Sequence, residues 1–224
     1  MRARRPHPSP FQERTFSVPQ LVRAAYGDFD VALIVLLRKP WQRMHSAFYA
    51  YPHYRNKYGA QAAGEFQWAN ESLRAFRTCE RAFGTDHCAL SFESLTRENE
   101  EVFYHCDQLI KGLYSVFLKR WRKEHRRILL LRSEQYFAEP RAVLSRSLAF
   151  LGLNLPTNDA TWTPLLKPAV QLAGTRPVAG TPPLAAQILD ILKQFYAQSL
   201  DELVLSLRGE LDADEWRTWA ELNH

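Results

Sequence analysis

Two short, fully apolar runs predict buried strands. Residues 31–37 form an unbroken run of seven apolar side chains, and residues 128–131 form a run of four. Runs that are apolar at every position are typical of strands covered on both faces, as in parallel sheets. The first run is followed by Arg-Lys-Pro at 38–40, and proline suits the first turn of a helix. We therefore expect a strand over 31–37 and a helix that begins at residue 40 or 41 and ends at 51.

Helical spacing of apolar residues predicts most of the remaining elements. The clearest pattern lies in 99–122, where one face is apolar at positions i, i+3, i+4 and i+7 without a break. The other expected helices cover 19–26, 65–83, 140–151 and 184–207. The helix over 65–83 would bury Phe66, Leu73, Phe76 and Phe83 and end at Gly84, a residue type that favours helix termination.

Proline content separates one segment from the rest. Residues 153–183 hold six of the thirteen prolines and have no apolar period, which predicts a long functional loop. Residues 1–14 are rich in Arg, Pro and His and predict a flexible lead-in to one domain over 15–224. Two strands, each followed by a helix, predict an α/β protein with a parallel sheet.

Composition and charge narrow the classes of function. With 224 residues and 46% hydrophobic side chains, the chain is long enough to bury a core. The net charge of +5 favours an anionic ligand without requiring nucleic acid. The longest apolar run is far shorter than the roughly 20 residues of a membrane-spanning helix, and the basic N-terminus lacks the apolar stretch of a signal peptide.

The three cysteines leave two arrangements open. Cys79, Cys88 and Cys106 form either one disulfide with a free thiol or three reduced thiols. Their spacing does not match a zinc site, so we expect no bound metal. An Asn-Glu-Ser sequon at 70–72 adds a weak indication of an oxidising lumen.

The end of the first strand carries the strongest chemical signal. Open α/β sheets bind ligands beyond the carboxyl ends of their strands, where Arg38 lies. A guanidinium, the N-terminus of a helix and the hydroxyl of Ser46 could converge there on a phosphate. Helical geometry places Arg43 and Ser46 together, opposite the side that faces the core, on which Tyr51 is expected to lie. The alternative is that Arg38 only ends the strand and Ser46 is solvated.

The whole string over 33–48 resembles the 3'-phosphate-binding segment of sulfotransferases. The family pattern is an apolar strand, Arg-Asp-Pro, two variable residues, Arg, two variable residues and Ser. Here Lys39 stands in place of the usual Asp, whereas Arg38 and Ser46 occupy the positions of the two phosphate contacts. Further blocks at 112–121, 127–136, 150–153 and 195–196 follow in the family's order. The resemblance covers about residues 20 to 215 and is closest to Golgi carbohydrate sulfotransferases that modify chondroitin-like glycans.

The resemblance implies a function and a cofactor. The fold would be a P-loop-like parallel sheet with flanking helices, and the donor would be 3'-phosphoadenosine 5'-phosphosulfate (PAPS). The reaction would move a sulfuryl group to a carbohydrate hydroxyl of a sulfated or anionic glycan in the Golgi lumen, with no nucleic-acid partner. A loop that closes over the nucleotide in the family is best matched by Gly174 and Arg176, although an ordinary surface turn fits these residues equally well.

The N-terminal segment, residues 1–30, departs from the sulfotransferase pattern. Sulfotransferases begin with a strand and a Lys- and Gly-containing loop that wraps the 5'-phosphosulfate, and nothing in 1–30 resembles them. We therefore expect a family member that lacks its first βα unit and any membrane anchor, and no catalytic base is assigned. Alternatives are a non-catalytic descendant that keeps nucleotide or glycan binding, and a basic module that binds nucleic acid through 119–127. Glu134 matches a family acidic residue, but capping the turn that follows is its expected role.

Overall fold

The structure is a computed structural model that describes residues 17–90, 106–174, 182–208 and 213–221. The expected lead-in over 1–14 lies outside the described residues. In chain order, the elements are α1 (Val18–Tyr26), β1 (Leu33–Leu37), α2 (Pro40–Ala50), α3 (Pro52–Tyr58), α4 (Ala62–Phe83), α5 (Thr85–Leu90), α7 (Tyr114–Glu124), β2 (Ile128–Arg132), α8 (Ser133–Ala138), α9 (Pro140–Phe150), α10 (Asp159–Gly174), α11 (Ala186–Ser206) and α12 (Ala213–Glu221).

The two predicted strands pair with each other. β1 and β2 are parallel, in a register that runs from Leu33 opposite Ile128 to Leu37 opposite Arg132. The described part of the chain is mostly helical, and this small parallel sheet agrees with the α/β class. β1 begins two residues later than predicted because the amide of Val31 bonds to the Phe29 carbonyl in a turn.

One face of β1 is not covered as the apolar run predicts. Val35 and Leu37 lie toward α7, but Ile34 and Leu36 are 41% and 50% exposed. Side chains alternate between the two faces of a strand, so these two residues share the opposite face. The prediction of a strand buried on both faces is therefore wrong for β1.

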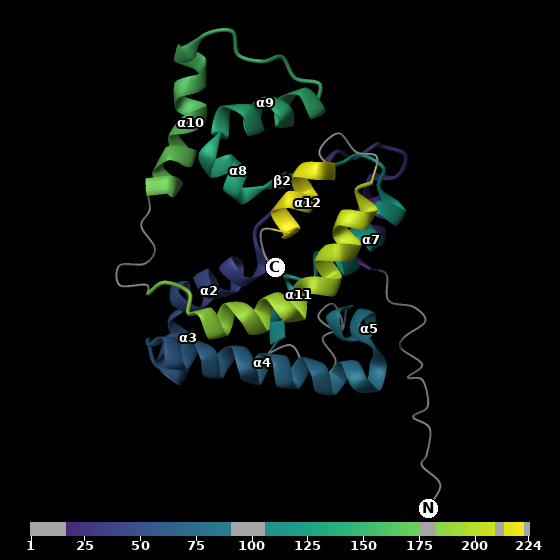
Figure 1. The fold of residues 1–224 in the computed structure, drawn as a ribbon. Helices are drawn as coiled ribbons and strands as arrows, with labels where there is room; N and C mark the ends of the chain where they lie inside the picture. The colour runs from purple at the N-terminus through teal and green to yellow at the C-terminus, as the bar shows by residue number, and fades with distance from the viewer. Residues whose placement is uncertain (1–16, 91–105, 175–181, 209–212, 222–224) are drawn as a thin grey trace, which may run out of the picture.

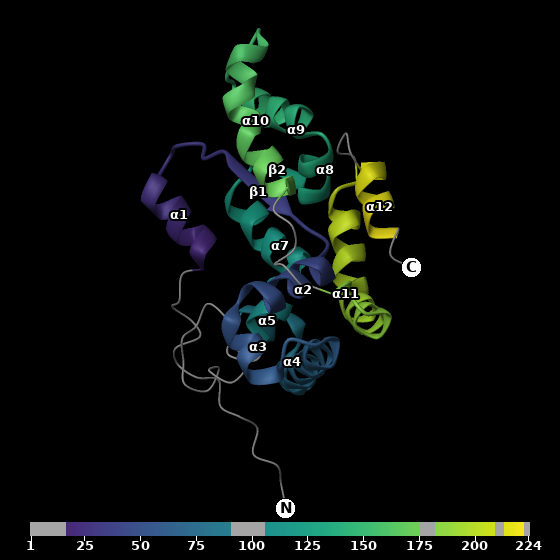
Figure 2. The ribbon, with the colours of Figure 1, turned by 90° about the vertical axis from the view of Figure 1, so that its left-hand side faces the viewer.

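A central helix, α11, organises the core. It packs against α2, α4, α7 and α12 (Figures 1 and 2), and its Leu192, Tyr196 and Leu203 are fully buried. Phe48 from α2 and Phe76 from α4 are also fully buried in this core. The periodic apolar residues predicted for this helix thus supply the surface on which these four helices assemble.

The helix expected over 99–122 is interrupted. Residues 106–110 are helical, and α7 begins only at Tyr114. The helix is therefore interrupted at residues 111–113. A Cβ on Gly112 would lie 2.6 Å from Cε1 of Tyr196 and 2.8 Å from Cβ of Pro40. Only a residue without a side chain fits between these neighbours. The apolar period continues across the break, which is why the pattern alone predicts one helix.

The expected loop over 153–183 contains a helix instead. Asn158 caps α10 because its side-chain oxygen accepts the Thr161 amide at 3.0 Å. Trp162 is buried, and its indole donates to the Pro156 carbonyl. A cap and one buried anchor suffice to form a helix in spite of its internal prolines. Residues 175–181 lie outside the described part.

Several short elements and two side chains also differ from expectation. The pattern did not predict α3, α5, α8 or α12, which have six to nine residues each. Phe83, expected in the core, is 56% exposed at the end of α4, and Tyr51 is 48% exposed after α2. Within the described ranges, no helix is both long and apolar enough to cross a membrane.

Candidate functional site

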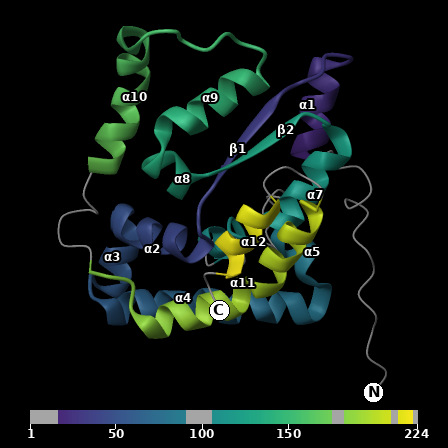
Figure 3. The same cartoon turned by 45° about the horizontal axis from the view of Figure 1, so that its top comes forward.

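Arg38 lies at the carboxyl end of β1, where the strand leads into α2 (Figure 3). Its carbonyl accepts a 2.6 Å hydrogen bond from the hydroxyl of Tyr114 at the start of α7. Its guanidinium makes no hydrogen bond or ion pair with the described residues. The backbone of Arg38 is therefore held in place, while its half-buried side chain is free to bind a ligand.

Ser46 lies two turns further along α2. Ser46 follows the N-cap residue Lys39 by seven positions. At about 100° of rotation per residue, the two residues leave the helix axis in directions that differ by roughly 20°. The rise along α2 from Pro40 to Ser46 is about 9 Å. Within the described residues, the Ser46 hydroxyl makes no hydrogen bond. The two predicted phosphate contacts thus lie at the end of β1 and two turns into α2, and neither polar group has a partner among the described residues.

Arg43 does not accompany Ser46 as predicted. Its guanidinium bonds to the side-chain oxygen of Gln108 at 2.9 Å and also to the Gln108 carbonyl. This contact joins α2 to the helical stretch 106–110. Burial raises the pKa of the neighbouring Tyr114 hydroxyl, and the charge of Arg43 acts in the opposite direction. Arg43 is therefore a cross-link inside the fold, and the expectation that it lies opposite the core is wrong.

Glu134 binds the start of α2 from the other side. Its carboxylate accepts the Lys39 amide at 2.9 Å and the indole of Trp219 at 3.2 Å. A carboxylate at a helix N-terminus is favoured by the helix dipole. Glu134 thus caps α2 and not the turn that follows it, which corrects the sequence-based expectation. The Lys39 amide is therefore not available to an anion at this end of α2.

A buried pair beside Ser46 was not predicted. Glu65, in the first turn of α4, is 1% exposed, and both its oxygens lie within 3.0 Å of Nδ1 of His45. Burial, followed by the charge of Glu65, raises the pKa of the nearby Tyr49 hydroxyl to about 12. The pair joins α2 to α4 and so fixes the helix that carries Ser46. An acidic residue early in a helix is ordinarily a surface feature, so the sequence contained no signal for this contact.

The loop predicted to close over a nucleotide is only partly described. Gly174 is the last residue of α10, so it belongs to a helix that packs on α8 and α9. Arg176 lies outside the described residues. The proposed role of Gly174 and Arg176 at the nucleotide therefore stays a prediction.

The cysteines adopt the first of the two arrangements left open. Cys79 and Cys88 form a disulfide that links α4 to α5, and Cys106 is a buried free thiol. Burial raises the pKa of Cys106 to about 12. Among the described residues, no three His, Cys, Asp or Glu side chains gather in a way that could hold a metal ion.

Thiol labelling tests this arrangement. At mildly alkaline pH, Cys106 remains a buried, protonated thiol, and the thiolate is the reactive form. We expect a maleimide to label no cysteine in the folded chain and one cysteine after unfolding without reductant, as counted by intact mass. Reduction during unfolding should raise the count to three. Labelling of two or three cysteines in the unreduced chain would contradict the disulfide.

Comparison with known proteins identifies no relative of this chain. No protein-family model, no curated protein and no solved structure matches the chain.

Proposed function

We propose that the chain binds a nucleotide carrying a 3'-phosphate at Arg38 and Ser46 and acts as a sulfotransferase. PAPS would be the donor and a carbohydrate hydroxyl the acceptor. The observation that supports the proposal is a pair of polar groups without partners among the described residues. They are the guanidinium of Arg38 at the end of a parallel strand and the hydroxyl of Ser46 in the helix that follows. The sulfotransferase-type fold is part of the same proposal.

The position of Arg38 suits phosphate binding in two ways. Arginine offers a planar pair of N–H donors that matches a phosphate, and the carboxyl ends of parallel strands are where such ligands bind. The backbone around Arg38 is held from both sides by Tyr114 and Glu134. A site whose backbone is already ordered loses little conformational freedom when the ligand binds.

Sulfuryl transfer would proceed by in-line displacement. The acceptor oxygen attacks the sulfur, the bond from sulfur to the 5'-phosphate oxygen breaks, and the acceptor proton passes to a base. The products are a sulfate ester and 3'-phosphoadenosine 5'-phosphate. Arg38 and Ser46 hold the nucleotide away from the reacting sulfur, so their contribution is to positioning. We assign no residue as the base.

A second candidate function is nucleotide or glycan binding without transfer. Arg38 and Ser46 would contact the 3'-phosphate alone, so nucleotide binding there does not require the Lys-containing loop that sulfotransferases place around the 5'-phosphosulfate. A lysine and backbone amides around the 5'-phosphosulfate would supply much of the electrostatic stabilisation of the transfer.

The disulfide supports the proposed compartment. Disulfides persist in oxidising environments and are rare in reducing ones. The Cys79–Cys88 bond is therefore compatible with the Golgi lumen, where carbohydrate sulfotransferases act.

Calorimetric titration tests the proposal. We expect 3'-phosphoadenosine 5'-phosphate to bind and adenosine 5'-monophosphate, which lacks the 3'-phosphate, to bind at least tenfold more weakly. Equal affinities, or no binding by the folded chain, would contradict the site. Sulfate transfer from PAPS to a chondroitin acceptor then separates the two candidates, because the binding protein would bind the nucleotide without transferring sulfate.

A further inference from the structure

A polar cleft of about 510 Å³ lies apart from Arg38 and Ser46. Residues from the end of α4 and from α5 line one side of the cleft, residues from α11 line the other, and residues from the start of α7 form the floor. Its volume is within the range of roughly 300–1,000 Å³ for small-molecule sites. The nucleotide proposal makes no use of this cleft.

The floor of the cleft is an ordered chain of hydrogen bonds. The Ser115 hydroxyl lies 3.0 Å from the Ser199 hydroxyl and donates to Glu202 at 3.1 Å. Because Ser115 has one proton and gives it to the carboxylate, Ser199 must donate to Ser115. Both serines are more than 90% buried. Gln198 donates to the other oxygen of Glu202 at 3.0 Å, so both oxygens of this carboxylate are held by hydrogen bonds.

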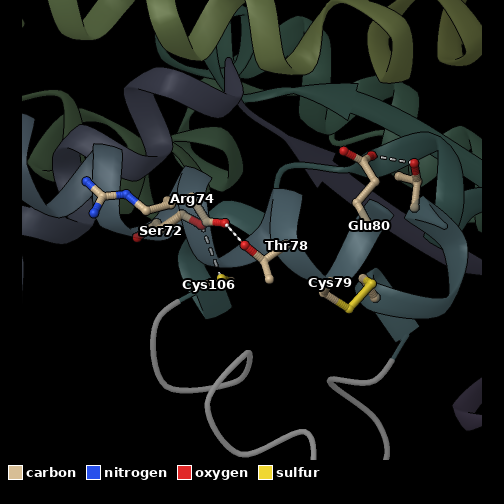
Figure 4. The surroundings of a disulfide bond; sticks show 8 residues. Ser72, Arg74, Thr78, Cys79, Glu80 and Cys106 are labelled. Atoms are coloured by element: carbon tan, nitrogen blue, oxygen red, sulfur yellow. Dashed lines mark hydrogen bonds between the residues drawn. A yellow bond between two sulfur atoms is a disulfide. The ribbon is translucent and has the colours of Figure 1, made fainter. Parts of the chain in front are cut away.

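The wall formed by the end of α4 and by α5 carries two more carboxylates, those of Glu80 and Asp86. One oxygen of Glu80 accepts the Thr85 hydroxyl at 2.6 Å, and no described residue bonds to the other. Figure 4 shows the Glu80 carboxylate pointing away from the disulfide at Cys79. Asp86 is exposed at the cleft and makes no hydrogen bond or ion pair within the described residues. The Cys79–Cys88 bond links the two helices of this wall.

The charges of the cleft favour a cation. Three carboxylates line it, from Glu80, Asp86 and Glu202, against one guanidinium from Arg77. His87 is the remaining titratable group of the lining in the described part of the chain. A concave surface with excess carboxylates attracts cations and repels sulfate and carboxylate groups.

The other lining groups favour a cation that also carries hydroxyls. Phe83 and Phe195 line the cleft, and the faces of aromatic rings attract ammonium groups. Gln194 also lines it and has no hydrogen bond to a described residue, so its amide can both donate and accept. Amides and carboxylates around an aromatic face suit a ring that presents several hydroxyls.

We propose that this cleft binds an amino sugar, a polyhydroxylated organic cation. The ammonium group would lie between the carboxylates of the two walls, and the hydroxyls would bond to Gln194 and to the free oxygen of Glu80. This site is separate from the proposed nucleotide site, and it prefers the opposite charge.

Three probes test the ligand class by calorimetry on the full chain. The glucosamine trisaccharide carries amines and hydroxyls, its fully N-acetylated form lacks the charge, and spermidine lacks the hydroxyls. We expect the glucosamine trisaccharide to bind at least tenfold more tightly than either of the others, at a pH where its amines are protonated. Equal or tighter binding of the acetylated sugar or of spermidine would overturn the proposal, as would no binding of any probe.

Charge-removing variants test the location. Glu80→Gln and Asp86→Asn should each weaken binding of the glucosamine trisaccharide about tenfold, since each removes a charged contact. The matched control is Asp201→Asn, which removes an exposed carboxylate from α11 outside the lining. Asp86 is exposed, so its variant should fold as the parent does, as thermal unfolding would verify. Unchanged affinity in both cleft variants would overturn the assignment.

Discussion

Replacing Arg38 with alanine should reduce the affinity for 3'-phosphoadenosine 5'-phosphate at least about 100-fold, because a bidentate charge-assisted contact to the 3'-phosphate is lost. The Arg38 carbonyl is bonded to Tyr114 and the next amide, that of Lys39, is bonded to Glu134, and neither contact uses the side chain that the variant removes. The measurement is calorimetric titration of the variant and the parent under the same salt conditions, since phosphate contacts are screened by salt.

Three companion variants show whether the loss is specific. Arg38→Lys keeps the charge but not the planar fork, so an intermediate loss is expected. Ser46→Ala should weaken binding by roughly 1 to 3 kcal/mol, the range for a hydrogen bond to a charged group. Arg126→Ala is the control, because it removes an exposed positive charge far along the chain at the end of α7. Unchanged affinity in both Arg38→Ala and Ser46→Ala would remove the site.

Gly112→Ala should destabilise the fold by about 3 kcal/mol, at the upper end of the range for overpacking. The added carbon would lie 2.6 Å and 2.7 Å from ring atoms of Tyr196 and 2.8 Å from Cβ of Pro40. Tyr196 is fully buried, and its hydroxyl is bound to the Leu109 carbonyl at 2.7 Å, so the ring cannot easily move aside. Urea unfolding followed by tryptophan fluorescence measures the change in free energy of unfolding.

A second glycine and a double variant separate crowding from backbone strain. Gly152 has φ of +72° and no neighbour within 4 Å of an added Cβ. Gly152→Ala should therefore cost only about 1 kcal/mol, from the backbone conformation alone. In a Tyr196→Ala background, where the ring is gone, Gly112→Ala should cost clearly less than in the parent. The same cost in both backgrounds would contradict steric contact as the cause.

Local patterns in the sequence predicted the elements that carry the candidate site. The apolar runs that became β1 and β2 and the proline at position 40 act over a few residues, because strand burial and helix initiation depend on near neighbours. The strand-to-helix junction that presents Arg38 could therefore be predicted. So could the angular position of Ser46, which depends only on helical geometry.

The partners of the side chains could not be predicted in this way. Arg43 turns to Gln108, 65 residues away, and Glu134 caps a helix 95 residues earlier in the chain. Helical periodicity gives the direction in which a side chain leaves the helix axis. It does not identify the residue that packs against that side chain. The same reasoning explains the burial of Glu65, which is compatible with the core only because His45 lies within hydrogen-bond distance.

The sequence by itself thus determined where the two strands and the helices α2, α4, α9 and α11 form, and that Arg38 lies at the carboxyl end of β1. Only the tertiary structure decided the break at Gly112, the disulfide between Cys79 and Cys88, and the cleft between α4, α5 and α11. The reason is the range of the interactions. Propensity and periodicity act within a few turns of chain, whereas close packing and hydrogen-bond pairing join residues up to about 100 positions apart, and their outcome depends on how the helices assemble.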